Sequence, residues 1–309
     1  MITSVFGKSK PINFILCAVL LLVYFVIYLF SGYKAVGLEF LTAELPVVLL
    51  LLFSLFMVNF VVKKNDLTEQ NDYALFVFTL VIGFFPSIFQ HINIVLMQLL
   101  ILFALRRIIS LGSLRSVKQK LFDASFFIGL AVLFDAWMVL YMAIVYLGIL
   151  LYVSSDYKNW LVPFIGFGVV VMLYSIYVYL TKQALPTNSL LEFDVQINYS
   201  TTNYRRIALH FVIAFLFSII FVLFLLKYKS YSSQKKLSFL IIKMLFFIGT
   251  FYVLLAKNSI QNSEFLFAFP LAVFMANLLE NIENKRIANS ILFILMIVSF
   301  LFNIYLKEA

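Results

Sequence analysis

Apolar runs separated by short polar segments repeat along the whole chain. Most of these runs approach the roughly twenty residues that a helix needs to cross a hydrocarbon core of about 30 Å. They lack the alternation of polar and apolar residues that is typical of membrane barrel strands. The pattern therefore predicts an all-α fold, a polytopic transmembrane helical bundle of about eleven helices.

The expected spans are Ile12–Ser31, Leu45–Val62, Ala74–Phe89, Ile94–Ile109, Leu121–Leu133, Trp137–Val153, Trp160–Leu180, Ile207–Leu226, Leu237–Leu255, Phe265–Leu279 and Ile287–Tyr305. We expect residues 1–309 to form a single integral membrane domain, because no separate soluble segment interrupts the pattern. The longest polar interval, at about 181–206, predicts an external loop. Pro86 is expected to kink the third span.

The apolar stretch from Leu121 to Val153 has two possible interpretations. A single helix of this length would measure about 50 Å, which is too long for a hydrocarbon core of about 30 Å. A single crossing would also reverse the orientation of every later segment. We therefore predict two short helices that turn at 134–136.

Composition and charge support a membrane location. Hydrophobic residues make up 64% of the chain and charged residues 12%, whereas soluble domains carry about 25% charged residues. The net charge of +9 does not indicate nucleic acid, because membrane proteins concentrate Lys and Arg in cytoplasmic loops. The lipid bilayer is thus the expected partner, together with a membrane-protein partner, and Cys17 has no second cysteine for a disulfide.

The distribution of basic residues predicts the orientation. With the N-terminus inside and the C-terminus outside, sixteen basic residues fall on the cytoplasmic side and six outside. The inside set is Lys8, Lys10, Lys63, Lys64, Arg106, Arg107, Arg115, Lys118, Lys120, Lys158, Lys227, Lys229, Lys235, Lys236, Lys285 and Arg286. This bias predicts an N-in, C-out topology.

Charged residues within the apolar runs are candidates for function, because burying a charge in a bilayer is costly. Arg106 and Arg107 end the fourth span, and Asp123 lies just inside the fifth. We interpret them as a structural ion pair between neighbouring helices. A proton or substrate path is the alternative, and a transporter would need a polar cavity near the midplane.

Carboxylates near the external face favour another hypothesis. Transferases that use polyprenyl-phosphate-linked sugars or lipids need an external carboxylate as a general base or metal ligand. Glu39 and Glu44 in the first external loop and Asp135 at the hairpin turn are the catalytic candidates, and Arg205 and Arg206 are candidates for binding the phosphate. The chain lacks the paired Asp-Asp or Asp-x-Glu motif of such enzymes.

No cofactor or metal is expected. His91 and His210 are the only histidines, which is too few for a four-histidine iron centre, and both are interpreted as interfacial residues. The chain has no Walker sequence, dinucleotide-binding glycine motif or nucleophile elbow.

A family resemblance rests on motifs between Asn65 and Gly166. The residues that carry it are Leu67-Thr68, Asn71, Phe85-Pro86, Arg106-Arg107, Leu121-Phe122-Asp123-Ala124-Ser125, Ala131-Val132-Leu133-Phe134 and Trp160-Leu161-Val162-Pro163-Phe164-Ile165-Gly166. This segment resembles an uncharacterised family of polytopic inner-membrane proteins of Bacteroidota. The resemblance implies a Gram-negative inner membrane. Members sometimes carry a carotene-oxygenase label, which the histidine count contradicts.

Three functions remain open at this point. The first is a non-catalytic partner or assembly subunit of a cell-envelope complex, which fits the short loops and the wide apolar helix faces. The second is the transferase, and the third is a small-molecule transporter. The helix layout also resembles that of large membrane glycosyltransferases, a likeness that assigns no reaction.

Overall fold

The apolar runs form helices in the computed structural model, which describes residues 2–30, 38–182, 233–255 and 263–305. Every regular element within these described ranges is helical. Seven of the described helical segments are long and apolar enough to cross a membrane. The protein is therefore an all-helical, multi-pass membrane protein.

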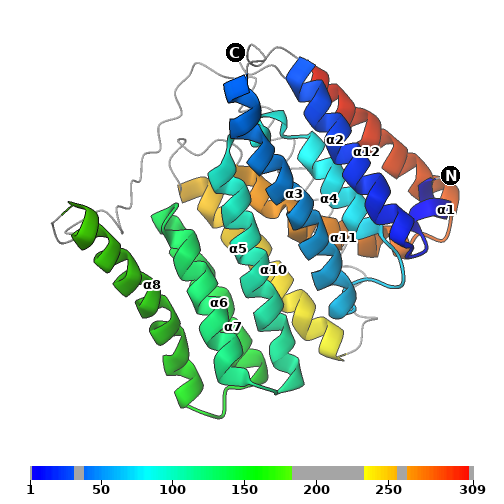
Figure 1. Ribbon diagram of the computed structural model, residues 1–309. Coiled ribbons are helices and arrows are strands. Elements are labelled where there is room, and N and C mark those ends of the chain that lie inside the picture. The colour runs from blue at the N-terminus through cyan, green and yellow to red at the C-terminus, as the bar shows by residue number, and fades with distance from the viewer. Residues whose placement is uncertain (1, 31–37, 183–232, 256–262, 306–309) are drawn as a thin grey trace. The chain divides into compact units, whose positions relative to one another are not determined.

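The described α-helices are α1 (Ile2–Phe6), α2 (Pro11–Phe30), α3 (Leu38–Lys64), α4 (Tyr73–Gly83), α5 (Ile92–Ile109), α6 (Val117–Val132), α7 (Met142–Tyr152), α8 (Lys158–Lys182), α10 (Ser233–Leu255), α11 (Ala268–Glu280) and α12 (Lys285–Tyr305) (Figure 1). Short 3-10 helices are η1 (Pro86–Gln90), η2 (Ser110–Ser113), η3 (Ala136–Tyr141) and η5 (Ser263–Phe267). The span predicted at Ile207–Leu226 and almost all of the loop predicted at 181–206 lie outside the described residues. The described helices do not correspond one to one to the predicted spans, so the number of spans stays a prediction.

The third predicted span is not one kinked helix. Helix α4 ends at Gly83, and Pro86 then begins η1. Proline has no N–H to donate, and its ring clashes with the carbonyl four residues earlier, so the helix stops before it. Phe85, directly before the proline, has φ −123° and ψ 71°. This conformation lies outside the helical region, which a following proline disfavours.

The stretch from Leu121 to Val153 forms two helical segments. Helix α6 ends at Val132, Asp135 adopts an extended conformation with φ −156°, and η3 begins at Ala136. The chain then continues directly from η3 into α7. The predicted division into two short segments is confirmed for the described residues.

The chain divides into two compact units, each described here by itself. Unit 1 contains α1 to α4, η1, η5, α11 and α12, and unit 2 contains η2, α6, η3, α7, α8, α10 and most of α5. The division falls within α5, after Val95. We predicted a single integral membrane domain because no soluble segment interrupts the apolar pattern, and this stays a prediction.

Unit 1 is built around the short helix α4. All eleven residues of α4 are buried, among α2, α3, α11 and α12. A Cβ on Gly83 would lie 2.6 Å from the Tyr24 ring, so this glycine allows α2 to approach α4 closely. The Tyr24 hydroxyl and Ser299 Oγ lie 2.6 Å apart, which joins α2 to α12.

Unit 2 contains a close contact between α6 and α8. A Cβ on Gly129 would lie 2.9 Å from Val170 Cγ2, and a Cβ on Gly166 would overlap Ser125 Oγ. Small residues let the backbones of membrane helices approach, so that van der Waals packing holds the pair together.

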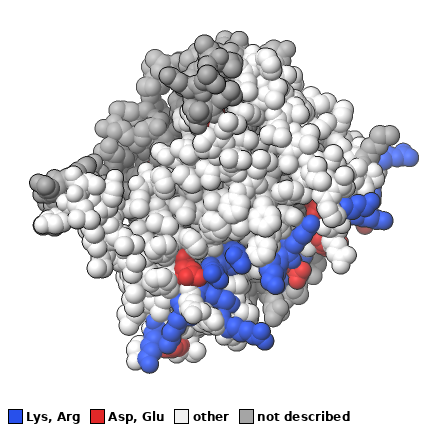
Figure 2. Space-filling model, viewed as in Figure 1, with Lys and Arg blue, Asp and Glu red and all other residues white. Residues whose placement is uncertain are grey.

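Within each unit, most basic residues of the described helices lie at one end of them, whereas Lys182 ends α8 and Lys243 lies within α10. In unit 1 this end comprises the start of α2, the start of α12 and the end of α3. In unit 2 it comprises the end of α5 and the starts of α6, α8 and α10. Figure 2 shows Lys and Arg gathered in patches, and large parts of the described surface on the same face carry no charged side chain. We call these helix ends the basic ends of unit 1 and unit 2.

Candidate functional site

A buried carboxylate, Asp72, lies at the basic end of unit 1. Its side chain is 1% exposed and lies 2.9 Å from Lys63 Nζ at the end of α3. It accepts hydrogen bonds from Ser9 Oγ at 3.2 Å, from the Lys10 backbone N–H at 3.0 Å and from Asn13 Nδ2 at 2.6 Å. We call these five residues the Asp72 cluster. It joins the start of α2, the end of α3 and the start of α4.

A second set of hydrogen bonds ties α11 to the loop between α3 and α4. Glu280 Oε1 accepts from the Glu69 backbone N–H at 3.0 Å and from Asn71 Nδ2 at 2.6 Å. Asn277 Nδ2 donates to the Leu67 carbonyl at 3.0 Å. The loop therefore has polar contacts with a helix that lies about two hundred residues later in the sequence.

The N-terminal segment is also fixed to this end of unit 1. The Ile2 backbone N–H donates to Asn289 Oδ1 of α12 at 2.7 Å. Phe6 stacks on Phe76 of α4 with ring centroids 4.3 Å apart. The Asp72 cluster and these contacts hold together helices that are distant in sequence, and the cluster was not identified from the sequence. The available signal was the acidic residue directly before the apolar run of α4, near the basic end of α3.

In unit 2, Arg107 Nη2 of α5 lies 2.8 Å from Asp123 Oδ2 of α6. The two side chains are 38% and 31% exposed, so the pair is partly solvated and stabilises the fold modestly. Arg106, the residue before Arg107, is half-buried. The geometry links two neighbouring helices, as a structural pair does.

Asp135 lies at the turn between α6 and η3. Its Oδ1 accepts from the Trp137 backbone N–H at 2.8 Å, and its Oδ2 accepts from the Tyr252 hydroxyl of α10 at 2.9 Å. Burial raises the pKa of the Asp135 carboxyl, and these two hydrogen bonds oppose that rise. Asp135 thereby connects the α6–α7 hairpin to α10.

The other carboxylates proposed for catalysis fall in unit 1 or outside the described side chains. Glu44 of α3 is buried, with 3% of its surface exposed. Glu39 lies in α3, but its side chain is outside the described part. Arg205, Arg206 and His210 also lie outside the described residues, and His91 follows η1. Glu44 and Asp135 belong to different units.

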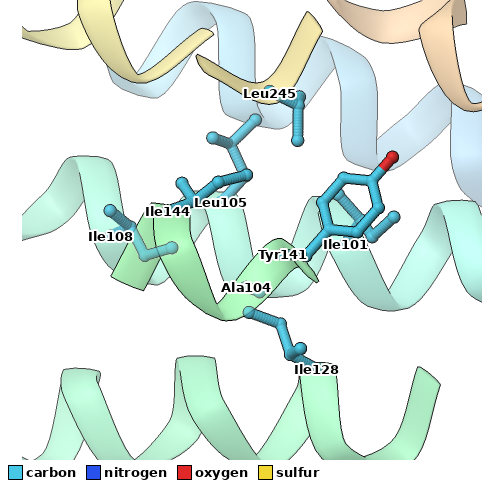
Figure 3. Close-up of a pocket in the computed structure, with 8 residues that line it drawn as sticks. All are labelled: Ile101, Ala104, Leu105, Ile108, Ile128, Tyr141, Ile144 and Leu245. Atoms are coloured by element: carbon cyan, nitrogen blue, oxygen red, sulfur yellow. The ribbon is translucent and has the colours of Figure 1, made fainter. Parts of the chain in front are cut away.

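Two hollows occur in unit 2. One is an apolar cavity of about 10 Å³, the size of one water molecule (Figure 3). Its lining residues are Ile101, Ala104, Leu105, Ile108, Ile128, Tyr141, Ile144 and Leu245. The other is a groove of about 290 Å³ between α6 and α8. Among the described residues, no three His, Cys, Asp or Glu side chains gather as a metal-binding group.

Comparisons with known proteins give no further guidance. No family model, no curated protein and no solved structure matches the chain. The resemblance to the Bacteroidota family therefore stays a prediction.

Proposed function

We propose that this protein is a non-catalytic partner or assembly subunit of a cell-envelope complex, embedded in a bacterial inner membrane. The proposal includes the N-in, C-out orientation with about eleven spans. The shared basic ends of the helices in each unit support this orientation, because cytoplasmic segments are enriched in Lys and Arg.

The polar residues of the described helices support a structural role. Asp72, Asp123, Asp135 and Glu280 each bind a group from another segment of the same unit. Charges and amides in a bilayer are costly unless they are paired. These residues therefore stabilise the bundle itself.

The observation that carries the proposal is the uncovered surface of α8. Nine of its large hydrophobic side chains are at least 45% exposed, and they occupy more than half of the helix circumference at about 100° per residue. They are Leu161, Phe164, Ile165, Met172, Leu173, Ile176, Tyr177, Tyr179 and Leu180.

A small residue interrupts this exposed surface. A Cβ on Gly168 would meet no atom of the described structure within 4 Å. Gly168 is also not needed for the contact with α6, which uses Gly166. Glycine on an exposed face of a membrane helix lets another helix approach closely. We therefore place the partner helix at Gly168 of α8.

The experiment is purification in mild detergent followed by mass spectrometry of co-purifying proteins. The wild type is expected to carry a stoichiometric membrane protein, and Gly168→Leu is expected to reduce its recovery at least tenfold, because the new side chain separates the two helices. The fold is expected to remain intact, as measured by the thermal unfolding midpoint.

Leu150→Trp is the matched control, since position 150 is exposed on α7 and lies outside the surface of α8 where we place the partner. It is expected to keep the partner. A wild-type protein that runs alone and monomeric, or a partner that remains bound to the Gly168→Leu variant, contradicts the proposal.

One observation favours the transferase as a second candidate. Glu44 is an ionisable residue buried within an apolar bundle, and such residues are functional candidates. If Glu44 is the general base, Glu44→Gln reduces activity by about 10²- to 10⁴-fold, and a deletion phenotype is not complemented. If the protein is a non-catalytic subunit, the variant complements fully, as does the exposed control Glu283→Gln. Complementation in both variants removes Glu44 as the general base of a transferase.

A further inference from the structure

The groove between α6 and α8 lies at the basic end of unit 2. Its volume of about 290 Å³ is close to the lower limit of small-molecule sites, about 300 Å³. The lining residues are Lys118, Gln119, Phe122, Asp123, Val162 and Ile165. The first four come from α6 and the last two from α8, and both polar and apolar side chains contribute.

The groove exists because of the close contact beside it. Gly166 packs against Phe122 and Ser125, so the helices nearly touch there. Towards the start of both helices, the side chains of Phe122, Val162 and Ile165 line an open space instead. The groove is therefore formed by the packing of α6 against α8, which Gly166 fixes.

The polar rim of the groove favours an anion. Lys118 is exposed, and its ammonium has no hydrogen-bond or ion-pair partner among the described residues. Asp123 would repel an anion, but its charge is neutralised by Arg107 at 2.8 Å.

The start of α6 adds further donors. Ser116, which precedes this helix of sixteen residues, makes no side-chain cap. The first backbone N–H groups of a helix have no partner within the helix, and they attract anions. Arg115 is exposed directly before this position. The rim therefore combines a lysine, backbone donors and a neutralised acid.

The walls of the groove favour an acyl chain. Ile165 is 59% exposed and Leu161 is 56% exposed, and both belong to the spanning segment Lys158–Thr181. A molecule in the groove would therefore have its polar group at the helix ends and its apolar part along the exposed surface of α8. Membrane lipids combine these two properties.

From this arrangement we infer that the α6–α8 groove is a binding site for an anionic phospholipid. The phosphate lies at Lys118 and the start of α6, and an acyl chain lies along Phe122 and Ile165. Basic pockets between membrane helices on the cytoplasmic side bind anionic lipid headgroups in this way. The groove shares Ile165 with the exposed surface of α8, whereas Gly168, where we place the partner helix, does not line it.

The test is native mass spectrometry of the full chain in detergent, titrated with phosphatidylglycerol or with zwitterionic phosphatidylcholine. Phosphatidylglycerol is expected to give one retained lipid, and phosphatidylcholine is expected to bind at least fivefold more weakly. Lys118→Gln should weaken phosphatidylglycerol binding about fivefold, which corresponds to about 1 kcal/mol for one lysine at a membrane surface.

Lys64→Gln removes an equal charge from an exposed lysine of unit 1 and is expected to leave this binding unchanged. Ile165→Trp, which fills the groove, should weaken lipid binding and leave the thermal midpoint unchanged. Equal binding of the two lipids, or equal effects of Lys118→Gln and Lys64→Gln, overturns the inference. Displacement of the lipid by millimolar inorganic phosphate would also overturn it, because the site would then recognise phosphate without the acyl chain.

Discussion

Asp72→Ala is expected to lower the free energy of unfolding by about 3 kcal/mol, because removing one partner of a buried ion pair costs about 3–5 kcal/mol. Lys63 is 42% exposed and regains water, which places the cost at the lower end of this range. The Lys10 N–H, however, loses its acceptor, and Asn13 Nδ2 keeps only the Val5 and Lys8 carbonyls. Thermal unfolding in detergent, followed by fluorescence, measures the effect.

The same variant is expected to release the N-terminal segment before the bundle unfolds. Hydrogen exchange of residues 2–10 should increase, since two of their bonds to Asp72 are lost. Glu69→Ala is the control, because Glu69 is an exposed acid in the same loop whose backbone N–H, and not its side chain, makes the contact with Glu280. If the two variants unfold alike, the Asp72 cluster does not hold this end of unit 1 together.

Gly166→Leu is expected to disrupt the contact between α6 and α8. The new side chain would overlap Ser125 and the Phe122 backbone, and overpacking a well-packed contact costs about 1–3 kcal/mol or more. We expect the upper end of this range, because backbone atoms cannot move aside as a flexible side chain can. The thermal midpoint and the yield of monodisperse protein measure the loss.

Gly168→Leu provides the matched control on the same helix, two positions further along. A side chain there meets open space, so the free energy of unfolding should change by no more than about 0.5 kcal/mol. An equal loss of stability in both variants would show that α8 is sensitive to any added bulk, and would refute the specific role of Gly166.

The positions of many helices could be predicted from the sequence, because membrane insertion depends on hydrophobicity within a local window. The expected span Ile12–Ser31 corresponds to α2, and the expected span Trp160–Leu180 lies within α8. The division of the stretch from Leu121 to Val153 followed from the thickness of the bilayer and from the orientation that the basic residues require of the later segments. The break before Pro86 was anticipated only as a kink, since a proline either bends or ends a helix according to its surroundings.

The candidate site was predicted less completely. Arg107 and Asp123 were identified because charges inside apolar runs are rare and need partners. Asp72 was missed, because it lies in a polar loop where a charge requires no explanation. Its burial becomes evident only when α2, α3 and α4 are assembled around it.

The sequence by itself determined that this is a helical membrane protein, because the bilayer requires long apolar segments whose backbone groups bond within each helix. Tertiary structure decided which polar residues meet. Asn71 binds Glu280 across 209 positions, and Tyr252 binds Asp135 across 117 positions. It also decided that Gly166 is packed whereas Gly168 is open. These facts depend on which helix faces meet, and no local pattern of residues specifies that pairing.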